Sequence, residues 1–181
     1  MVGELRATHS CVMRKTLLFL ALLFASTRVF AADEMRKLDF LIGEWKGEAT
    51  AQMGPGKPQR VAQTESVKSK LGGKVLLIEG LGRRQNEDGS LGEIVHDALA
   101  VISWDEAKKT YRFSGYTAQY GAMETTLDAG PDNTWLWGSD IPGGKMRYTI
   151  RLTKEGAWNE VGEFSRDGAV WIKFFEMTLK K

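Results

Sequence analysis

Apolar and polar residues alternate along most of this chain. From Gly43 to the C-terminus the hydrophobic period is two, in segments of eight to twelve residues, and this period places successive side chains on opposite faces of a β-strand. Nine turn-forming breaks separate the segments: 54–56, 72–73, 86–89, 105–109, Gly121, 131–133, 142–144, 155–156 and 167–168. Ten strands joined by hairpins predict an all-β fold, a single antiparallel barrel, because closure leaves no edge strand.

The segment 33–42, directly before the first strand, has a different period. Its apolar residues recur at helical spacing and its first turn is acidic, so we predict a short N-terminal helix or 3₁₀ segment. On the strand that follows, Trp45 belongs to an apolar set that alternates with charged residues. We therefore expect Trp45 to point inward and plug the closed end of the barrel, with direct ligand contact as the alternative.

The N-terminal residues have the features of an export signal. Arg14 and Lys15 precede an apolar run at 16–25, which is too short to span a bilayer, and small side chains then suit cleavage after residue 31. We predict a signal peptide at 1–31 and a mature domain at 32–181, secreted or periplasmic. A retained N-terminal anchor is the alternative, and the methionine before the basic pair is an alternative start.

Cleavage would change the charge balance and the available chemistry. It would lower the net charge from +2 to −1, because four basic residues and one acidic residue are removed: Arg6, Arg14, Lys15, Arg28 and Glu4. The remainder has no basic cluster larger than a pair, so neither nucleic-acid binding nor membrane contact is expected after cleavage. Cys11 is the only cysteine, and its loss excludes a disulfide, a thiolate nucleophile and a Cys-ligated metal.

Catalytic and cofactor motifs are not evident. The mature chain has a single histidine, His96, and no serine motif or metal-ligand spacing accompanies it. Gly80-Leu81-Gly82 lacks the third glycine and the helix of a dinucleotide site. We therefore expect a binding protein without cofactor or metal rather than an enzyme. The sequence does not indicate an oligomeric state.

A resemblance to a known family agrees with the predicted fold. In FLIGEWKGE, residues 40–48, a tryptophan follows a glycine by two residues at the start of the first strand. Further segments continue the similarity: QTES at 63–66, LIEG at 77–80, ALAV at 98–101, RYTI at 147–150 and GEFSRDG at 162–168. Together they resemble a family of secreted bacterial proteins known only as a domain of unknown function, related to nitrobindin-like and lipocalin-like (calycin) barrels.

The resemblance covers residues 35–180 and implies a fold and an extracytoplasmic location. It implies little about function. Nitrobindin-like haem barrels use a histidine late in the chain as the iron ligand, and residues 145–181 contain none. Haem binding in that manner is therefore not expected.

Two-residue turns at the last two breaks would fix the register of the C-terminal strands. In that register Tyr148 faces Glu163 inside the barrel, while Arg151 pairs with Glu160 outside. Three polar residues then fall on the apolar inner face: Asn159, Glu163 and Glu176. Burying an unpaired carboxylate is costly, so these groups form structural hydrogen bonds in a dry core or line a wet lumen that orients a ligand, and both interpretations stay open.

Two residues on earlier strands are further candidates for the lumen. A turn at 72–73 places Glu65 on the same face as Val67 and Ile78, and His96 shares strand parity with an apolar set that includes Ile102. For His96 a core or rim position is the alternative to a ligand contact. The predicted ligand-binding residues are Trp45, Glu65, His96, Tyr148, Asn159, Glu163 and Glu176.

Three functions compete. The leading hypothesis is an exported barrel that holds a small amphipathic or hydrophobic molecule in its mouth. The alternative is a protein-interaction module with an exposed aromatic outer face, formed by Trp158, Phe164, Trp171 and Phe175. The third is an enzyme that uses the lumenal carboxylates of Glu163 and Glu176.

Overall fold

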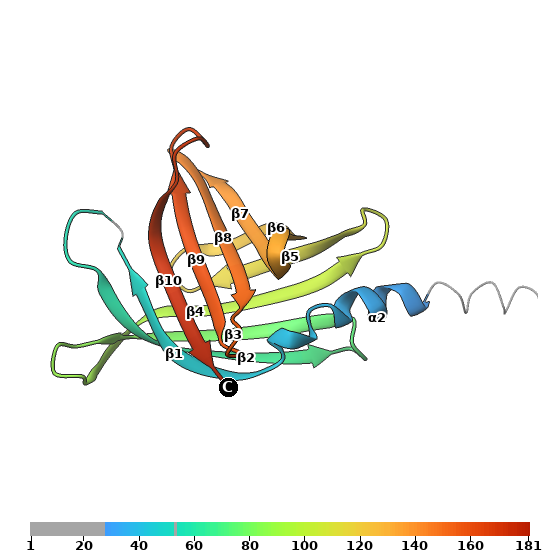
Figure 1. Cartoon of the computed structure of the whole chain (residues 1–181), viewed down its shortest axis with the longest axis horizontal. Helices are drawn as coiled ribbons and strands as arrows, with labels where there is room; N and C mark the ends of the chain where they lie inside the picture. Colours follow the sequence, from blue (N-terminus) through green and yellow to red (C-terminus); the bar gives the residue numbers. More distant parts are fainter. Residues whose placement is uncertain (1–27, 53) are drawn as a thin grey trace, which may run out of the picture.

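A computed structural model describes residues 28–52 and 54–181 as a closed antiparallel β-barrel preceded by a helix (Figure 1). The elements are α2 (Arg28–Arg36), η1 (Asp39–Leu41), β1 (Gly43–Ala51), β2 (Gln59–Lys70), β3 (Val75–Gln85), β4 (Leu91–Asp105), β5 (Thr110–Thr117), β6 (Gly121–Ala129), η2 (Pro131–Asn133), β7 (Thr134–Ile141), β8 (Gly144–Leu152), β9 (Trp158–Ser165) and β10 (Ile172–Lys180). The predicted all-β class and the ten strands are confirmed. Most of the predicted signal peptide, residues 1–27, lies outside the described residues.

Each strand pairs with the next one along the chain, and β1 pairs with β10 to close the barrel. All nine predicted breaks fall at or within the connections between consecutive strands. Gly89 and Gly143 show why, since their φ angles of 82° and 90° lie in the left-handed region that tight hairpins require and that glycine adopts at little cost. None of the helices within the described ranges is long and apolar enough to cross a membrane.

One end of the barrel is filled with side chains. The most deeply buried inward-facing residues gather there: Trp45, Val67, Leu76, Ile102, Leu127, Ile150 and Leu179. Trp45 is only 2% exposed. Its indole N–H donates to the Leu41 carbonyl at 2.7 Å, and its ring meets Trp158 edge-on with the centroids 5.8 Å apart. The predicted burial of Trp45 at the end beside the N-terminal helix is confirmed.

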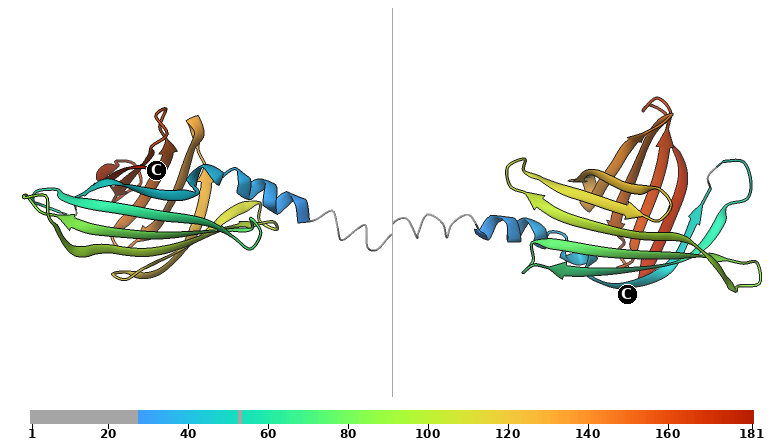
Figure 2. Two further views of the ribbon diagram at one scale, coloured as in Figure 1. Left: turned by 90° about the horizontal axis from the view of Figure 1, so that it is seen from below. Right: turned by 180° about the vertical axis from the view of Figure 1, so that it is seen from behind.

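The segment before β1 covers this closed end. Met35, Leu38 and Leu41 are buried in the core, and the Tyr111 hydroxyl donates to the Glu34 carbonyl at 2.8 Å. The expected helical segment is therefore present, but it consists of the end of α2 and the separate turn η1. Figure 2 shows α2 at one end of the sheet formed by the first strands, where it contacts β4.

The register predicted for the N-terminal strands is confirmed. Val67 pairs with Ile78 and Glu65 with Gly80 across β2 and β3, as a turn centred on 72–73 requires. His96 pairs with Gly82, on the inward face that it shares with Ile102. Residues directly opposite in an antiparallel pair lie on the same face of the sheet, so Glu65 and His96 both face the interior.

The register predicted for the C-terminal strands is wrong. The β8–β9 loop has three residues, not two, because the Thr153 N–H donates to the Ala157 carbonyl at 2.8 Å and Gly156 takes a φ of 78°. One extra residue reverses every side chain that follows it. Tyr148 therefore faces Gly162, not Glu163.

The last hairpin also departs from the predicted register, but by an even number of residues, so β10 follows the reversal of β9. Phe164 pairs with Ile172, and a bulge interrupts the β9–β10 ladder between Lys173 and Phe175. Glu160, predicted outside in a pair with Arg151, is buried inside opposite Ile150. The predicted outer aromatic face is also wrong, because Trp158 is buried and Phe175 packs against the core: the alternative of an interaction module loses the surface that motivated it.

The barrel wall is incomplete between β6 and β7. These strands pair only from Leu127 opposite Trp137 to Ala129 opposite Trp135, whereas the β5–β6 ladder has seven residue pairs, from Tyr111 opposite Leu127 to Thr117 opposite Gly121. Figures 1 and 2 show β5 and β6 turning away from β7 and β8 beyond the paired end. The backbone wall of the barrel is therefore not hydrogen-bonded over this stretch.

Candidate functional site

Two glutamates on different strands point into the barrel, Glu65 on β2 and Glu160 on β9. Glu65 lies opposite the buried Trp45, and Glu160 lies opposite the buried Ile150. They are only 8% and 7% exposed, respectively. Carboxyl groups are rarely buried to this extent unless they are paired with a cation. These two residues are therefore the leading candidates for a functional site inside the barrel.

The Glu65 carboxylate accepts a hydrogen bond from a neighbouring amide and occupies space left by two glycines. Gln63 donates from Nε2 to Oε1 of Glu65 at 2.7 Å. A Cβ at Gly80 would lie 2.7 Å from both carboxylate oxygens, and a Cβ at Gly82 would collide with the Gln63 amide oxygen, so these glycines give the polar pair its space. Burial raises the pKa of Glu65 to about 7, against the lowering effect of the Gln63 hydrogen bond, and the charge of Glu160 raises it further.

Glu160 is surrounded by aromatic and aliphatic groups. The Trp137 indole donates to its Oε1 at 3.0 Å. Trp158, the preceding inward residue on β9, is also beside it, but its indole N–H is buried without an acceptor at hydrogen-bond distance in the described residues. Burial raises the pKa of Glu160 to about 7, although both indole groups favour its charged form.

Aromatic rings line the wall next to Glu160. Trp137 stacks on Tyr148, with centroids 4.0 Å apart, and on Phe113, with centroids 4.8 Å apart. Phe175 meets Tyr148 at 6.0 Å, at a steep angle. A Cβ at Gly162 would lie 2.7 Å from the Tyr148 ring, so a glycine is required beneath it. We refer to Phe113, Trp137 and Tyr148 as the aromatic stack.

Two titratable groups accompany the glutamates in the lumen. Burial raises the pKa of the Tyr148 hydroxyl, and the charge of Glu160 raises it further. Burial lowers the pKa of His96, with a smaller opposing effect from Asp97. Near neutral pH both groups are therefore uncharged, whereas the two glutamates, with pKa values of about 7, become charged as the pH rises.

Side chains become more accessible away from the closed end. On β8, Ile150 is buried whereas Tyr148 and Met146 are half-buried, and on β4 Ile102 is buried whereas His96 is half-buried. Burial therefore decreases along these two strands with distance from the sealed end.

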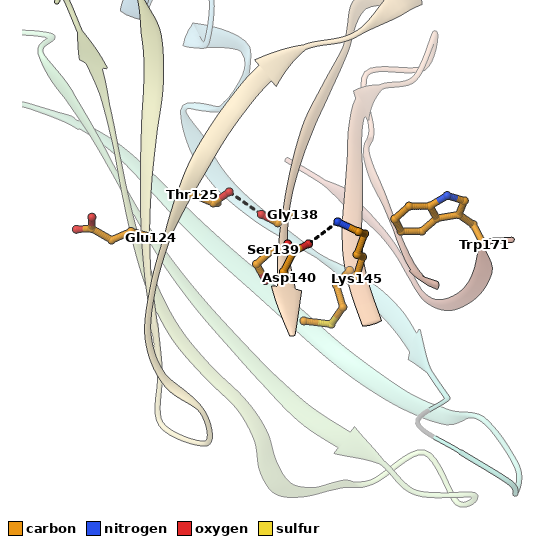
Figure 3. A pocket seen from close by; sticks show the side chains of 8 residues that line it. Glu124, Thr125, Gly138, Ser139, Asp140, Lys145 and Trp171 are labelled. Atoms are coloured by element: carbon orange, nitrogen blue, oxygen red, sulfur yellow. Dashed lines mark hydrogen bonds and ion pairs between the residues drawn. The ribbon is translucent and has the colours of Figure 1, made fainter. Parts of the chain in front are cut away.

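A pocket of about 510 Å³ occupies the gap in the wall. It is lined by Glu124, Thr125, Gly138, Ser139, Asp140, Lys145, Met146 and Trp171. Figure 3 shows Glu124 and Thr125 on one side and the β7 and β8 residues on the other. The Thr125 hydroxyl donates to the Gly138 carbonyl at 2.5 Å, and Lys145 pairs with Asp140 at 2.9 Å. Thr125, Ser139 and Met146 belong to the inward faces of their strands, so the pocket includes side chains from both faces of the wall.

The structure divides the seven predicted site residues into two groups. Trp45, Glu65, His96 and Tyr148 face the interior. The other three face outward, contrary to the prediction, and each has a polar partner there: Glu163 with Arg147 at 2.7 Å, Glu176 with Lys173 at 2.6 Å, and Asn159 with the Met177 carbonyl at 3.0 Å. The enzyme hypothesis based on Glu163 and Glu176 loses its lumenal carboxylates for the same reason.

Sequence reasoning missed Glu160, Gln63 and Trp137. Gln63 shares strand parity with Glu65, so the alternation that identified Glu65 also identifies it. Glu160 alternates with Trp158 and Gly162 on β9, a set with no other charged residue, and only the assumed loop length concealed it. Within the described ranges no three histidine, cysteine or acidic residues come close enough together to hold a metal ion.

Comparison with known proteins adds a family but no activity. Residues 31–129 match the family described as "Protein of unknown function (DUF1579)". This span includes Glu65 and His96 but ends before Trp137, Tyr148 and Glu160. No curated protein matches the chain. The match covers more than half of the chain, which therefore belongs to the DUF1579 family.

Proposed function

We propose that this protein is an exported carrier that binds a small amphipathic molecule in the lumen of its barrel. The observation that carries the proposal is the pair of buried glutamates, Glu65 and Glu160, beside the aromatic stack. Lumenal sites for small molecules typically combine an apolar wall with a few polar groups that fix orientation. This barrel has both, and the pocket at the short β6–β7 ladder is the proposed entry point.

The cost of these glutamates argues against a purely structural role. A shift in pKa from 4.5 to about 7 means that ionising Glu160 at neutral pH costs the folded state roughly 3 kcal/mol. An apolar residue of similar volume at the same position would avoid this cost. Features that lower stability without a structural benefit are typical of functional sites.

Export is part of the proposal and is supported by the N-terminal sequence. Cleavage after residue 31 leaves Glu34 and Met35 in the mature chain, so the contact with Tyr111 and the buried Met35 side chain would be retained. The proposed relation to calycin barrels is supported by the closed meander and the plug formed by Trp45. Expression of the full chain in bacteria, followed by N-terminal sequencing of periplasmic protein, tests the export step, with a start at residue 32 as the expected result.

Titration with a neutral fluorescent probe, N-phenyl-1-naphthylamine, tests lumenal binding. We expect saturable binding of one probe per chain and quenching of tryptophan fluorescence, because Trp137 lines the lumen. Ser139→Trp places a large side chain at the inner edge of the pocket and should abolish binding. Thr126→Trp, on the exposed outer face of β6, is the matched control and should retain it. Non-saturable uptake, or equal binding by both variants, would refute the proposal.

A further inference from the structure

We propose, on the basis of the lumenal binding function above, that the ligand is an amphipathic amine whose ammonium group sits between Glu65 and Glu160, with its apolar part against the aromatic stack. This assigns the sign of the ligand's charge and its orientation. The positive end lies near the sealed end of the barrel. The apolar part points toward the opening between β6 and β7.

The charge of the lumen excludes an anionic ligand. From residue 36 onward every lysine and arginine side chain is exposed except Arg147, which is half-buried and pairs with Glu163 on the outer face. No ion pair in the part of the chain that the structure describes includes Glu65 or Glu160. A carboxylate or phosphate beside Glu65 and Glu160 would meet two acids whose ion pairs are absent, so its binding is disfavoured.

The immediate neighbours of Glu65 provide no compensating positive charge. On its own strand the polar neighbour is Gln63, on β1 it is opposite Trp45, and on β3 it is opposite Gly80. On β4 the inward-facing titratable group is His96, whose pKa is lowered by burial, so it is uncharged at neutral pH. The charged residue that shifts the pKa of Glu65 is Glu160, another acid, and it raises that pKa.

The neighbours of Glu160 lead to the same conclusion. It faces Ile150 on β8 and Met177 on β10, and it accepts a hydrogen bond from Trp137 on β7. Tyr148 is the additional titratable group on β8, and its hydroxyl is neutral. A cation supplied by another molecule is the group that would neutralise this pair.

The hydrogen-bonding capacity of the site is also incomplete. An ionised carboxylate can accept about four hydrogen bonds, whereas Glu65 and Glu160 each accept one at their Oε1 atoms from the side chains Gln63 and Trp137. The Trp158 indole N–H lies beside Glu160 and favours its charged form, and it leaves further acceptor positions of the two carboxylates open. An ammonium group offers three donors, enough for both carboxylates.

The aromatic stack suits the rest of such a ligand. Ring faces attract cations and also pack against alkyl or aromatic groups. Tyr148, the member of the stack nearest the mouth on β8, is half-buried, so its surface is available. Trp45 and Trp158 are buried and in contact beside the glutamates, which limits how deeply a ligand can enter.

A series of three compounds with the same chain tests the charge assignment. Dodecylamine, dodecanol and dodecanoate, each below its micelle-forming concentration, are used to displace N-phenyl-1-naphthylamine from the full chain at pH 7.5. We expect dodecylamine to bind about tenfold or more tighter than dodecanol, and dodecanoate to bind most weakly. The ratio of amine to alcohol affinity is the readout, because it is insensitive to the fraction of folded protein.

Matched variants locate the effect. Glu65→Gln and Glu160→Gln should each lower the ratio, and the double variant should bring it close to one, while dodecanol affinity stays nearly constant. Glu163→Gln, on the outer face, should leave the ratio unchanged. Lowering the pH from 8 to 5.5 should also lower the wild-type ratio, since both carboxyl groups take up protons as the pH falls through 7 while the alkylammonium stays charged.

The outcomes separate this inference from the proposed function. Equal affinities for the three compounds, unchanged in the glutamine variants, would overturn the cation assignment and leave lumenal binding intact. Probe binding that Ser139→Trp fails to block would instead overturn the lumenal function itself. A ratio that falls in Glu163→Gln as much as in Glu160→Gln would overturn the location of the charge.

Discussion

Replacing Glu160 by glutamine should stabilise the protein above neutral pH. Glutamine has nearly the same shape and cannot ionise, so Glu160→Gln removes the buried charge and keeps the volume. Its amide oxygen can still accept the hydrogen bond from Trp137, which spans 3.0 Å in the wild type. The substitution therefore isolates the cost of the charge.

The magnitude follows from the difference in pKa between the two states of the chain. Glu160 ionises near pH 4.5 when the chain is unfolded and near pH 7 in the barrel. Because the folded state holds its proton more tightly, the wild type loses stability as the pH rises from about 4.5 through 7, and the loss is complete above 7. The stability advantage of Glu160→Gln should therefore grow by roughly 2–3 kcal/mol between pH 5 and pH 8.

Urea unfolding at pH 5 and pH 8, followed by tryptophan fluorescence, measures this difference. Ligand-free protein is required, because a bound cation would stabilise the wild type alone. The control is Glu163→Gln, which removes the outer ion pair with Arg147 and should change the unfolding free energy by less than about 1 kcal/mol at both pH values. Glu65→Gln should behave like Glu160→Gln, and the double variant should gain less than the sum, because the charge of Glu160 raises the pKa of Glu65.

One result would refute this reasoning. If Glu160→Gln is less stable than the wild type by the same amount at pH 5 and pH 8, the carboxyl group ionises in the barrel as it does in water. Glu160 would then face solvent. The account of the lumen as a low-dielectric, acidic cavity would fail with it.

Three further predictions concern the closed end and the space around Glu65. Trp45→Phe should lower the unfolding free energy by about 1–3 kcal/mol in urea titrations, because it removes the donor to the Leu41 carbonyl and leaves a cavity in the packed end of the barrel. An unchanged urea midpoint would contradict the role of Trp45 in closing that end. Tyr111→Phe should cost about 1 kcal/mol and speed amide exchange in 34–38, since its hydroxyl holds the Glu34 carbonyl; exchange that speeds up equally throughout the barrel would argue against a local contact. Gly80→Ala should lower the unfolding free energy by roughly 1–3 kcal/mol, because the new Cβ meets the Glu65 carboxylate. Gly92→Ala, where the nearest atom to the new Cβ is 3.4 Å away, should be nearly neutral. Adding Glu65→Ala to Gly80→Ala should recover part of the loss, and strictly additive changes in unfolding free energy would contradict the clash.

The order of strands is predictable from sequence because turn chemistry is local. Glycines such as Gly89 and Gly143 take left-handed conformations in their loops, and most of the predicted breaks contain a glycine, whereas 105–109 and 131–133 were identified by other turn-forming residues. The inward orientation of Glu65 followed for a similar reason, since the turn at 72–73 keeps the assumed register. Trp45 and His96 were placed by alternation alone, which needs no loop length.

The other half of the site depends on single-residue details that composition does not reveal. A glycine at position 156 suits a two-residue turn and a three-residue loop equally, and the hydrogen bond between Thr153 and Ala157 decides between them. That one residue exchanged Glu163 for Glu160 in the lumen. The bulge before Phe175 had no sequence signal, and neither did the early end of the β6–β7 ladder, because both arise from the twist needed to close the barrel.

The most direct test of the central claim is native mass spectrometry of the protein incubated with N-phenyl-1-naphthylamine, dodecylamine and dodecanol together. A lumen that holds a single molecule against Glu65, Glu160 and the aromatic stack predicts a one-to-one adduct in the wild type, with dodecylamine as the favoured component. The adduct should be absent from Ser139→Trp and present in Thr126→Trp. Adducts of equal abundance in all three proteins, or none in any of them, would contradict the claim that this barrel is a small-molecule carrier.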